Sequence, residues 1–277
     1  MDNILLKKFI IDGGRQKNNC IDGYVVMLDQ EKAYDRVDWG YMYRCLTKMG
    51  IGTGFTRYLK AIYTGAKTRV KINGGLTEPM EITRGLRQGD PLSPLLYNIV
   101  IEPLLVYLRA MLKGLKTTGL KFRTSAYADD ISVGISDKDD ADILEMGLEL
   151  HCKASNARVN RGKTLAISIG KPSAIDGFYS VLDKEANFRY LGITFNSYGI
   201  NQKFMEDKLL SDIDAKVKIL SKRHLSISGK VLLTNTLLLS KVWFSAQVIP
   251  FGKHFRDKLK RIVKNFIWNG KKSRIGI

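Results

Sequence analysis

The stretch that most constrains this chain is Ser125–Gly134, where two adjacent carboxylates, Asp129 and Asp130, stand between apolar segments. This pattern predicts a β-hairpin whose tight connection carries both carboxylates. Because side chains alternate across a strand, only one of the two aspartates can point directly at a given target. Aspartate also favours turns by bonding its own backbone, so an ordinary Asp-rich turn is the alternative interpretation.

A second carboxylate follows a strand much earlier in the chain. Tyr24–Leu28 is a short apolar run rich in β-forming residues, and Asp29 comes directly after it. The next residues, Gln30–Arg36, turn toward a helical pattern. Two strand ends with carboxylates in one domain suggest a shared metal site.

A glycine-rich loop that opens a helix, Arg84–Asn98, lies between these two segments. The three segments, in this order, resemble motifs A, B and C of a reverse transcriptase. The amino-acid sequences of Leu28–Trp39 and of Gln88–Pro94 are most similar to those of the LINE branch, the non-LTR retrotransposons. This resemblance implies an RNA-directed DNA polymerase that adds dNTPs to a primer 3′-OH. Because Met1 falls after the family's fingers strands, we expect an N-terminally truncated domain.

The resemblance also implies an α+β fold, the polymerase right hand, with an antiparallel sheet packed on helices as its palm. We expect a remnant of the fingers at residues 1–22 and the palm at 23–195, with a hairpin at 67–84 directed toward the fingers. A helical thumb is expected at 196–277.

Local sequence patterns are consistent with this layout. Amphipathic spacing and capping residues predict helices over residues 39–49, 55–63, 92–112 and 139–152. The second of these helices is expected to place Tyr58, Leu59 and Ile62 inward. A further strand is predicted at Leu165–Ile169.

Nucleotidyl transfer uses two Mg²⁺ ions roughly 3.5–4 Å apart, and magnesium prefers hard oxygen ligands. The resemblance implies that Asp29 and Asp129 bridge these ions, with Asp130 as a weaker or outer-shell partner. It also implies that the backbone carbonyl of Gln30 completes one coordination shell. Mn²⁺ is the expected substitute ion.

The resemblance assigns further roles around the incoming nucleotide. Tyr34 matches a steric gate that excludes a ribose 2′-OH, with a core tyrosine as the alternative. Gln88 and Gly89 match positions that contact the nucleotide. Lys163 matches a lysine that protonates the leaving pyrophosphate, with a solvated lysine as the alternative.

Charge predicts a nucleic-acid partner. The chain has 45 Lys and Arg against 27 Asp and Glu, a formal net charge of +18. Residues 203–277 hold 17 basic and 5 acidic residues, a net charge of +12. Such an excess favours phosphates through counterion release, so we expect an RNA template and a DNA primer as partners.

Two features of the C-terminal half are candidates for contacts with nucleic acid. An apolar stripe predicts a helix in which Lys208, Lys216 and Lys222 lie off the buried face. Residues 188–193 resemble the primer-grip hairpin, with Tyr190, Leu191 and Gly192 at its turn.

Other classes of protein are disfavoured. The three cysteines are isolated, so neither a zinc knuckle nor a disulfide framework is supported, and an intracellular location in the nucleus or cytoplasm fits. No apolar run reaches the roughly 18–20 residues of a membrane span, so no membrane partner is expected. The sequence does not indicate an oligomeric state.

Three alternatives remain. Viral RNA-dependent RNA polymerases share the paired aspartates but usually have Gly before them, where this chain has Ala128, and Tyr34 argues for dNTPs. A group II intron maturase is more similar to this chain, although the sequences of motifs A and B favour the LINE branch. The alternative from another class is a non-catalytic remnant that binds nucleic acid.

Overall fold

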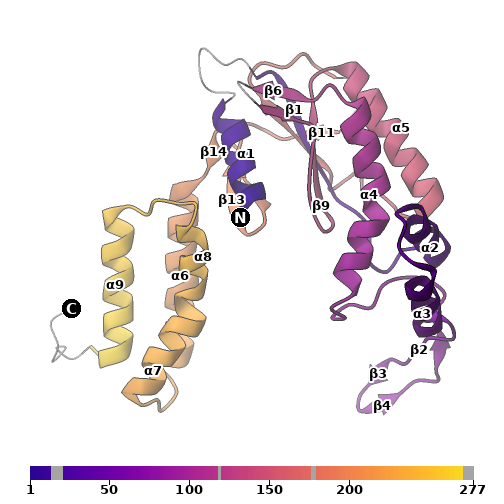
Figure 1. The fold of residues 1–277 in the computed structure, drawn as a ribbon. Helices are drawn as coiled ribbons and strands as arrows, with labels where there is room; N and C mark the ends of the chain where they lie inside the picture. Colours follow the sequence, from indigo (N-terminus) through magenta and orange to yellow (C-terminus); the bar gives the residue numbers. More distant parts are fainter. Residues whose placement is uncertain (14–20, 118–119, 176–178, 271–277) are drawn as a thin grey trace. The chain divides into compact units, whose positions relative to one another are not determined.

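The computed structural model describes residues 1–13, 21–117, 120–175 and 179–270. The chain forms two compact units (Figure 1). One is Gly13–Asp183, and the other joins Met1–Asp12 to Lys184–Ile277. The main division thus falls after residue 183, before the expected start of the thumb at residue 196, and the N-terminal segment belongs to the C-terminal unit.

A five-stranded sheet in the order β11-β10-β1-β9-β8 organises the first unit. Its central strand is β1 (Gly23–Leu28), which pairs antiparallel with β9 (Asp130–Ile135) and with β10 (Leu165–Ile169). Strand β8 (Thr124–Tyr127) forms one edge, and β11 (Ser180–Val181) runs parallel to β10 at the other. Because β1 is central and buried on both faces, its sequence is a continuous apolar run rather than an alternating one. The predicted hairpin and the predicted neighbouring strands are therefore confirmed.

Four helices complete the core of this unit. They are α2 (Trp39–Lys48), α3 (Thr53–Tyr63), α4 (Ser93–Met111) and α5 (Lys138–Ser155). Helix α4 packs against α2 and α5, and Figure 1 shows α4 and α5 side by side next to the sheet. The predicted helices are confirmed, but the expected inward face of α3 is wrong at Tyr58, which is exposed.

Helix α4 corrects the expectation about apolar length. Ser93–Met111 is long and apolar enough to cross a membrane by length and composition alone. Leu96, Val100, Leu104 and Leu108 form one face of this helix and are buried in the core of this unit, whereas Leu95, Val106 and Met111 are exposed. A helix that packs on other helices and near a sheet is expected to be apolar over much of its surface, which accounts for the composition.

A pair of short two-stranded ladders confirms the predicted hairpin after α3. Strand β2 (Lys67–Thr68) pairs with β5 (Met80–Glu81), and β3 (Lys71–Ile72) pairs with β4 (Gly75–Leu76). All four strands are exposed. A third ladder joins β6 (Leu115–Thr117) to β7 (Leu120–Phe122).

The second unit begins with helix α1 (Asp2–Gly13), which packs on a small sheet. The strands of this sheet are β12 (Phe188–Tyr190), β13 (Ile193–Asn196) and β14 (Gly199–Ile200). Lys7 is only 2% exposed, and its Nζ lies 3.1 Å from the ring centroid of Tyr190. A cation on an aromatic face in a desolvated site is attractive, so this contact ties α1 to the hairpin.

Four α-helices and a π-helical turn complete this unit. They are α6 (Gln202–Leu220), α7 (Ile227–Leu233), the π-helix η1 (Thr234–Leu238), α8 (Ser240–Ala246) and α9 (Lys253–Trp268). The predicted apolar stripe of α6 is confirmed, since it is buried against α9 and the neighbouring helices.

The pH dependence of stability tests the packing of α5. Burial lowers the pKa of the His151 imidazole from 6.5 to about 4. The unfolded chain then binds a proton between about pH 6.5 and pH 4 that the folded chain does not bind, so the free energy of unfolding falls as pH falls through this window. We expect His151→Gln to remove about 2–3 kcal/mol of that pH-dependent loss.

Urea unfolding at about pH 7 and about pH 4 measures the effect, with Trp39 as the fluorescent reporter in its own unit. Trp243 and Trp268 are changed to Phe for this purpose. His254→Gln, at an exposed position on α9, serves as the control. Equal pH dependence of the parent and His151→Gln chains would contradict the assignment.

Candidate active site

The register of the sheet brings the two acidic strand ends together. Leu28 on β1 pairs with Ile131 on β9, so Asp29 and Asp130 are the next residues at the same end of the strands. Facing residues of antiparallel strands have Cα atoms about 4.5–5.5 Å apart. Tyr127 pairs with Asp130, which leaves Ala128 and Asp129 as the two central residues of the turn.

The backbone of the turn determines how Asp129 is presented. Ala128 adopts a φ of +51°, which suits the first central position of a tight hairpin turn. Asp129 and Asp130 are exposed, whereas Ile131 beside them is buried. The strand is thus fixed in the core directly behind the carboxylates.

A second turn holds the backbone of Asp29 on both sides. The N–H of Asn160 donates to the Asp29 carbonyl at 2.8 Å, and the Asp29 N–H donates to Thr164 Oγ1 at 3.2 Å. Thr164 Oγ1 in turn donates to the carbonyl of Asn160 at 2.9 Å. Sequence reasoning missed both Asn160 and Thr164, because it assigned a role only to Lys163 in this segment.

The arrangement around Gln30 leaves its carbonyl available. Gln30 forms an antiparallel bridge with Val159, and the two flanking hydrogen bonds use the carbonyls of Asp29 and Arg158. Neither bond uses the carbonyl oxygen of Gln30. This geometry is compatible with the ligand role that was expected for that oxygen.

Tyr34 lies against a second tyrosine that the sequence analysis did not assign. The rings of Tyr34 and Tyr97 are stacked, with centroids 4.8 Å apart and planes 13° from parallel. Burial, and then the negative charge of Asp129, raise the pKa of both phenols. The charge of Asp129 thus acts on both phenols, in the direction expected of a carboxylate in their neighbourhood.

The glycine-rich loop is hydrogen-bonded to the segment that follows Asp29. The Leu86 N–H donates to the Tyr34 carbonyl and the Gly85 N–H donates to the Val37 carbonyl, both at 2.8 Å. Trp39 Nε1 donates to the Gly85 carbonyl at 2.8 Å. These bonds hold the expected motif B loop against Tyr34.

The predicted nucleotide contacts lie farther along this loop. Gln88 is exposed, and its Nε2 donates to Asp35 Oδ1 at 3.1 Å. Gly89 is also exposed and adopts a φ of +88°. Asp35 was not predicted as a site residue, although its carboxylate orients Gln88.

Lys163 lies in the same turn as Asn160. Its backbone N–H donates to the Asn160 carbonyl at 3.2 Å, and its side chain is exposed. The turn joins Lys163 to the segment that anchors Asp29 through its backbone. Its role as a proton donor stays a prediction.

The donor set suits a metal that is shared with substrate. Asp29, Asp129, Asp130 and the Gln30 carbonyl would offer the hard oxygen ligands that Mg²⁺ prefers. Among the residues that the structure describes, no group of three or more His, Cys, Asp or Glu side chains is arranged to hold an ion. Substrate phosphates would therefore have to supply further ligands, as is usual for Mg²⁺ in phosphoryl-transfer sites.

The three predicted primer-grip residues of the C-terminal unit differ in their exposure to solvent. Leu191 and Gly192 form the β12–β13 turn with φ values of +45° and +87°, a pattern typical of a tight hairpin. Tyr190 is 2% exposed and covers Lys7. Its ring faces the core, so only Leu191 and Gly192 of the expected primer grip reach the surface.

The three predicted phosphate-binding lysines also differ. Lys208 and Lys222 are exposed. Lys216 is half-buried, and its Nζ donates to the Leu237 carbonyl at 3.2 Å. A π-helical turn shifts the hydrogen-bond pattern of its helix, and Leu237 lies in η1. Lys216 therefore has a structural contact that Lys208 and Lys222 do not share.

An antiparallel sheet with carboxylates at the ends of adjacent strands, packed on helices, is the palm architecture of nucleotide polymerases. Residues 10–195 match the family described as reverse transcriptase (RNA-dependent DNA polymerase), and the chain belongs to this family.

Relatives of the chain occur in mobile elements. The uncharacterized 149 kDa protein of transposon TX1 from Xenopus laevis is 34% identical over 279 residues. A Pol polyprotein of a type-1 retrotransposable element R2 from Popillia japonica is 30% identical over 261 residues. These alignments cover 98% and 88% of this chain but 21% and 41% of the relatives. Both are non-LTR retrotransposon proteins, so the predicted branch of the family is confirmed.

Solved structures share the fold at low sequence identity. The telomerase of Candida tropicalis in complex with a TWJ fragment of telomeric RNA has a TM-score of 0.51 and 15% identity. The match covers 97% of this chain and 41% of that one. The apo telomerase of the same species has a TM-score of 0.50 at 14% identity, over 97% of this chain and 49% of that one. The expected polymerase right-hand fold is confirmed.

Two glycines of the motif B loop offer a matched test of its docking. Gly85 and Gly89 have φ values of +91° and +88°. A Cβ on Gly85 would lie 2.8 Å from the Asp35 carbonyl oxygen, whereas one on Gly89 would meet nothing within 4 Å. Alanine at either position incurs the left-handed backbone cost of about 1–2 kcal/mol.

We therefore expect Gly85→Ala to lower the free energy of unfolding by at least about 1 kcal/mol more than Gly89→Ala. Chemical denaturation of the two variants measures the difference. Equal losses would show that the loop is not held against Asp35.

Proposed function

We propose that this chain is the RNA-directed DNA polymerase part of a non-LTR retrotransposon protein, which transfers dNTPs onto a primer 3′-OH. The observation that carries this proposal is the pairing of Leu28 with Ile131, because it sets Asp29 beside Asp130 and the Asp129 turn. Membership of the reverse transcriptase family supports the same activity.

In this proposal Asp29 and Asp129 hold two Mg²⁺ ions, with Asp130 in a weaker position and the Gln30 carbonyl as a further ligand. When bound, the ions supply activation of the primer hydroxyl and neutralisation of the pyrophosphate. The chain's own contribution is rigid positioning. Asn160 and Thr164 hold the backbone of Asp29, and the β8–β9 pairing holds the turn that bears Asp129.

Tyr34 is assigned as the gate against ribonucleotides. Its ring is supported from one side by Tyr97, which is itself buried in the core. A supported ring cannot easily move aside for a 2′-OH, so the stack explains how an aromatic side chain can exclude a single oxygen.

The motif B loop is assigned to the incoming nucleotide. Gln88 is oriented by Asp35, and Gly89 leaves open space beside it. In the proposed reaction Lys163 is the general acid that donates a proton to the leaving pyrophosphate. This role requires its ammonium to come within hydrogen-bond reach of the pyrophosphate.

The nucleic-acid partners are assigned to the basic residues of the C-terminal unit. An RNA template and a DNA primer fit its excess of positive charge, and Lys208 and Lys222 are exposed for phosphate contacts. The β12–β13 turn at Leu191 and Gly192 is the assigned primer contact.

A second candidate function is binding of nucleic acid without catalysis. It is favoured by the lack, within the described ranges, of an acidic cluster able to hold a metal without substrate. The two candidates differ in primer extension, which only the first predicts.

Neutralising Asp129 distinguishes the two candidate functions. Asp129→Asn keeps the size of the side chain but removes its charge, so we expect primer extension on an RNA template with Mg²⁺ to fall about 10²-fold or more. Asp139→Asn, at an exposed position near the start of α5, is the control and should extend normally. Extension that survives in Asp129→Asn, or that is absent from the parent chain, contradicts the polymerase proposal.

Changing Tyr34 tests substrate choice. Tyr34→Val removes the ring from the sugar site and should raise the incorporation of rNTPs relative to dNTPs, by about tenfold if the gate is worth about 1.4 kcal/mol. Single-nucleotide extension with each triphosphate measures the ratio. Tyr43→Val, on α2, is the control. An unchanged ratio in an active Tyr34→Val chain would show that the gate lies elsewhere.

A further inference from the structure

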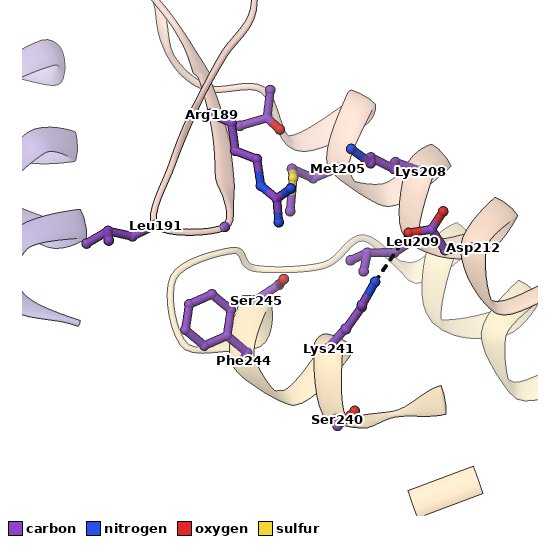
Figure 2. A pocket seen from close by; sticks show the side chains of 12 residues that line it. Arg189, Leu191, Met205, Lys208, Leu209, Asp212, Ser240, Lys241, Phe244 and Ser245 are labelled. Atoms are coloured by element: carbon purple, nitrogen blue, oxygen red, sulfur yellow. Dashed lines mark ion pairs between the residues drawn. The ribbon is translucent and has the colours of Figure 1, made fainter. Parts of the chain in front are cut away.

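A pocket of about 550 Å³ lies within the C-terminal unit, between the β12–β13 hairpin and helices α6 and α8. Figure 2 shows side chains from all three elements around it. Its volume falls in the range of small-molecule sites. The catalytic assignment above uses none of its side chains except Lys208 and the two residues of the hairpin turn.

One part of the lining is cationic. Arg189, Lys208 and Lys241 all line the pocket, together with a single carboxylate, Asp212. Lys241 Nζ lies 3.7 Å from Asp212 Oδ2, so these two charges largely compensate each other. Arg189 and Lys208 make no ion pair with a carboxylate among the described residues. The pocket therefore has an excess of positive charge carried by two exposed side chains.

Another part of the lining is aromatic and apolar. Phe244 is 40% exposed, and its ring borders the hairpin turn, since a Cβ on Gly192 would lie 3.2 Å from Phe244 Cε1. Met205 and Leu209 of α6 are buried beneath the same pocket. In Figure 2 the Arg189 guanidinium points from the hairpin toward α8, which carries Phe244.

A ligand that satisfies both parts must combine an anionic group with a flat apolar ring. A nucleotide unit has this chemistry, because its phosphate pairs with Arg and Lys and its base stacks on an aromatic face. We propose that this pocket binds a single unpaired nucleotide, with the phosphate at Arg189 and Lys208 and the base on Phe244. The nucleotide is either free or part of a bound strand.

Fluorescence of 2-aminopurine tests stacking directly, because the base is quenched when it stacks. The full chain is titrated with 2-aminopurine nucleoside monophosphate in EDTA, which keeps metal-dependent triphosphate binding out of the measurement. We expect saturable quenching, and the nucleoside without phosphate should bind at least about fivefold more weakly because it lacks the charge-assisted contacts.

Variants locate the site. Phe244→Leu should weaken binding about fivefold or more, since loss of one base–aromatic stack has an effect of this size. Its control is Trp243→Leu, the preceding residue on α8, which is 59% exposed and lines a different pocket. Arg189→Gln and Lys208→Gln should weaken binding of the phosphate form only, with Lys253→Gln of α9 as their control.

A strand with 2-aminopurine at an unpaired end, and the same strand fully paired, identify the source of the nucleotide. Quenching of the unpaired strand that depends on Phe244 assigns the pocket to a bound strand, and quenching of the monophosphate alone assigns it to a free nucleotide. Absence of saturable quenching in both arms overturns the proposal, as does quenching that is unchanged in Phe244→Leu. Primer extension by the parent chain is scored separately, so failure of this site does not imply failure of the polymerase assignment.

Discussion

The pairing of β1 with β9 is the constraint on which the candidate site depends. It sets Asp29 at the same end of the sheet as the turn that carries Asp129 and Asp130. A shift of one residue would turn every side chain of a strand to the other face. The register is protected because Val26, Val133 and Ile135 are fully buried on these two strands. The apolar packing of these two strands therefore fixes the position of the exposed carboxylates at their ends.

Hydrogen bonds from two loops hold the backbone of the segment that follows β1. The turn around Asn160 and Thr164 holds the backbone of Asp29, and the glycine-rich loop holds the backbone of Tyr34. Tyr97 supports the Tyr34 ring from α4, the central helix of the same core. The site is thus assembled from segments more than a hundred residues apart in the sequence, and each is fixed through its backbone or by ring packing.

Local patterns predicted much of this arrangement. The apolar run before Asp29 and the alternation around Asp129 predicted β1 and the β8–β9 hairpin, because buried strands leave a clear signal of residue type. The inward face of α3 was misjudged at Tyr58, since an aromatic residue in an amphipathic helix fits either face. The two acidic strand ends also came from local patterns, whereas the roles of Tyr34 and of the motif B loop came from resemblance to a family.

Contacts between distant residues were not predictable from the sequence. Nothing local distinguishes Thr164 from other turn threonines, and Asp35 is one acidic residue among many until the loop folds over it. Lys216 was grouped with Lys208 by helical spacing, but the carbonyl it reaches belongs to a π-helical turn that no periodicity revealed. The placement of α1 with the C-terminal unit likewise rests on Lys7 and Tyr190, which are 183 positions apart.

We propose above all that Asp29 and Asp129 bind metal together at one end of the sheet. Replacing Mg²⁺ with Fe²⁺ and adding ascorbate and peroxide generates hydroxyl radicals at the bound ion, which cut the backbone nearby. In the presence of a dNTP, we expect mass spectrometry to locate the cuts near Asp29 and in the Ala128–Asp130 turn, and we expect Asp129→Asn to abolish them. Cuts that fall elsewhere, or that persist unchanged in Asp129→Asn, would contradict the account.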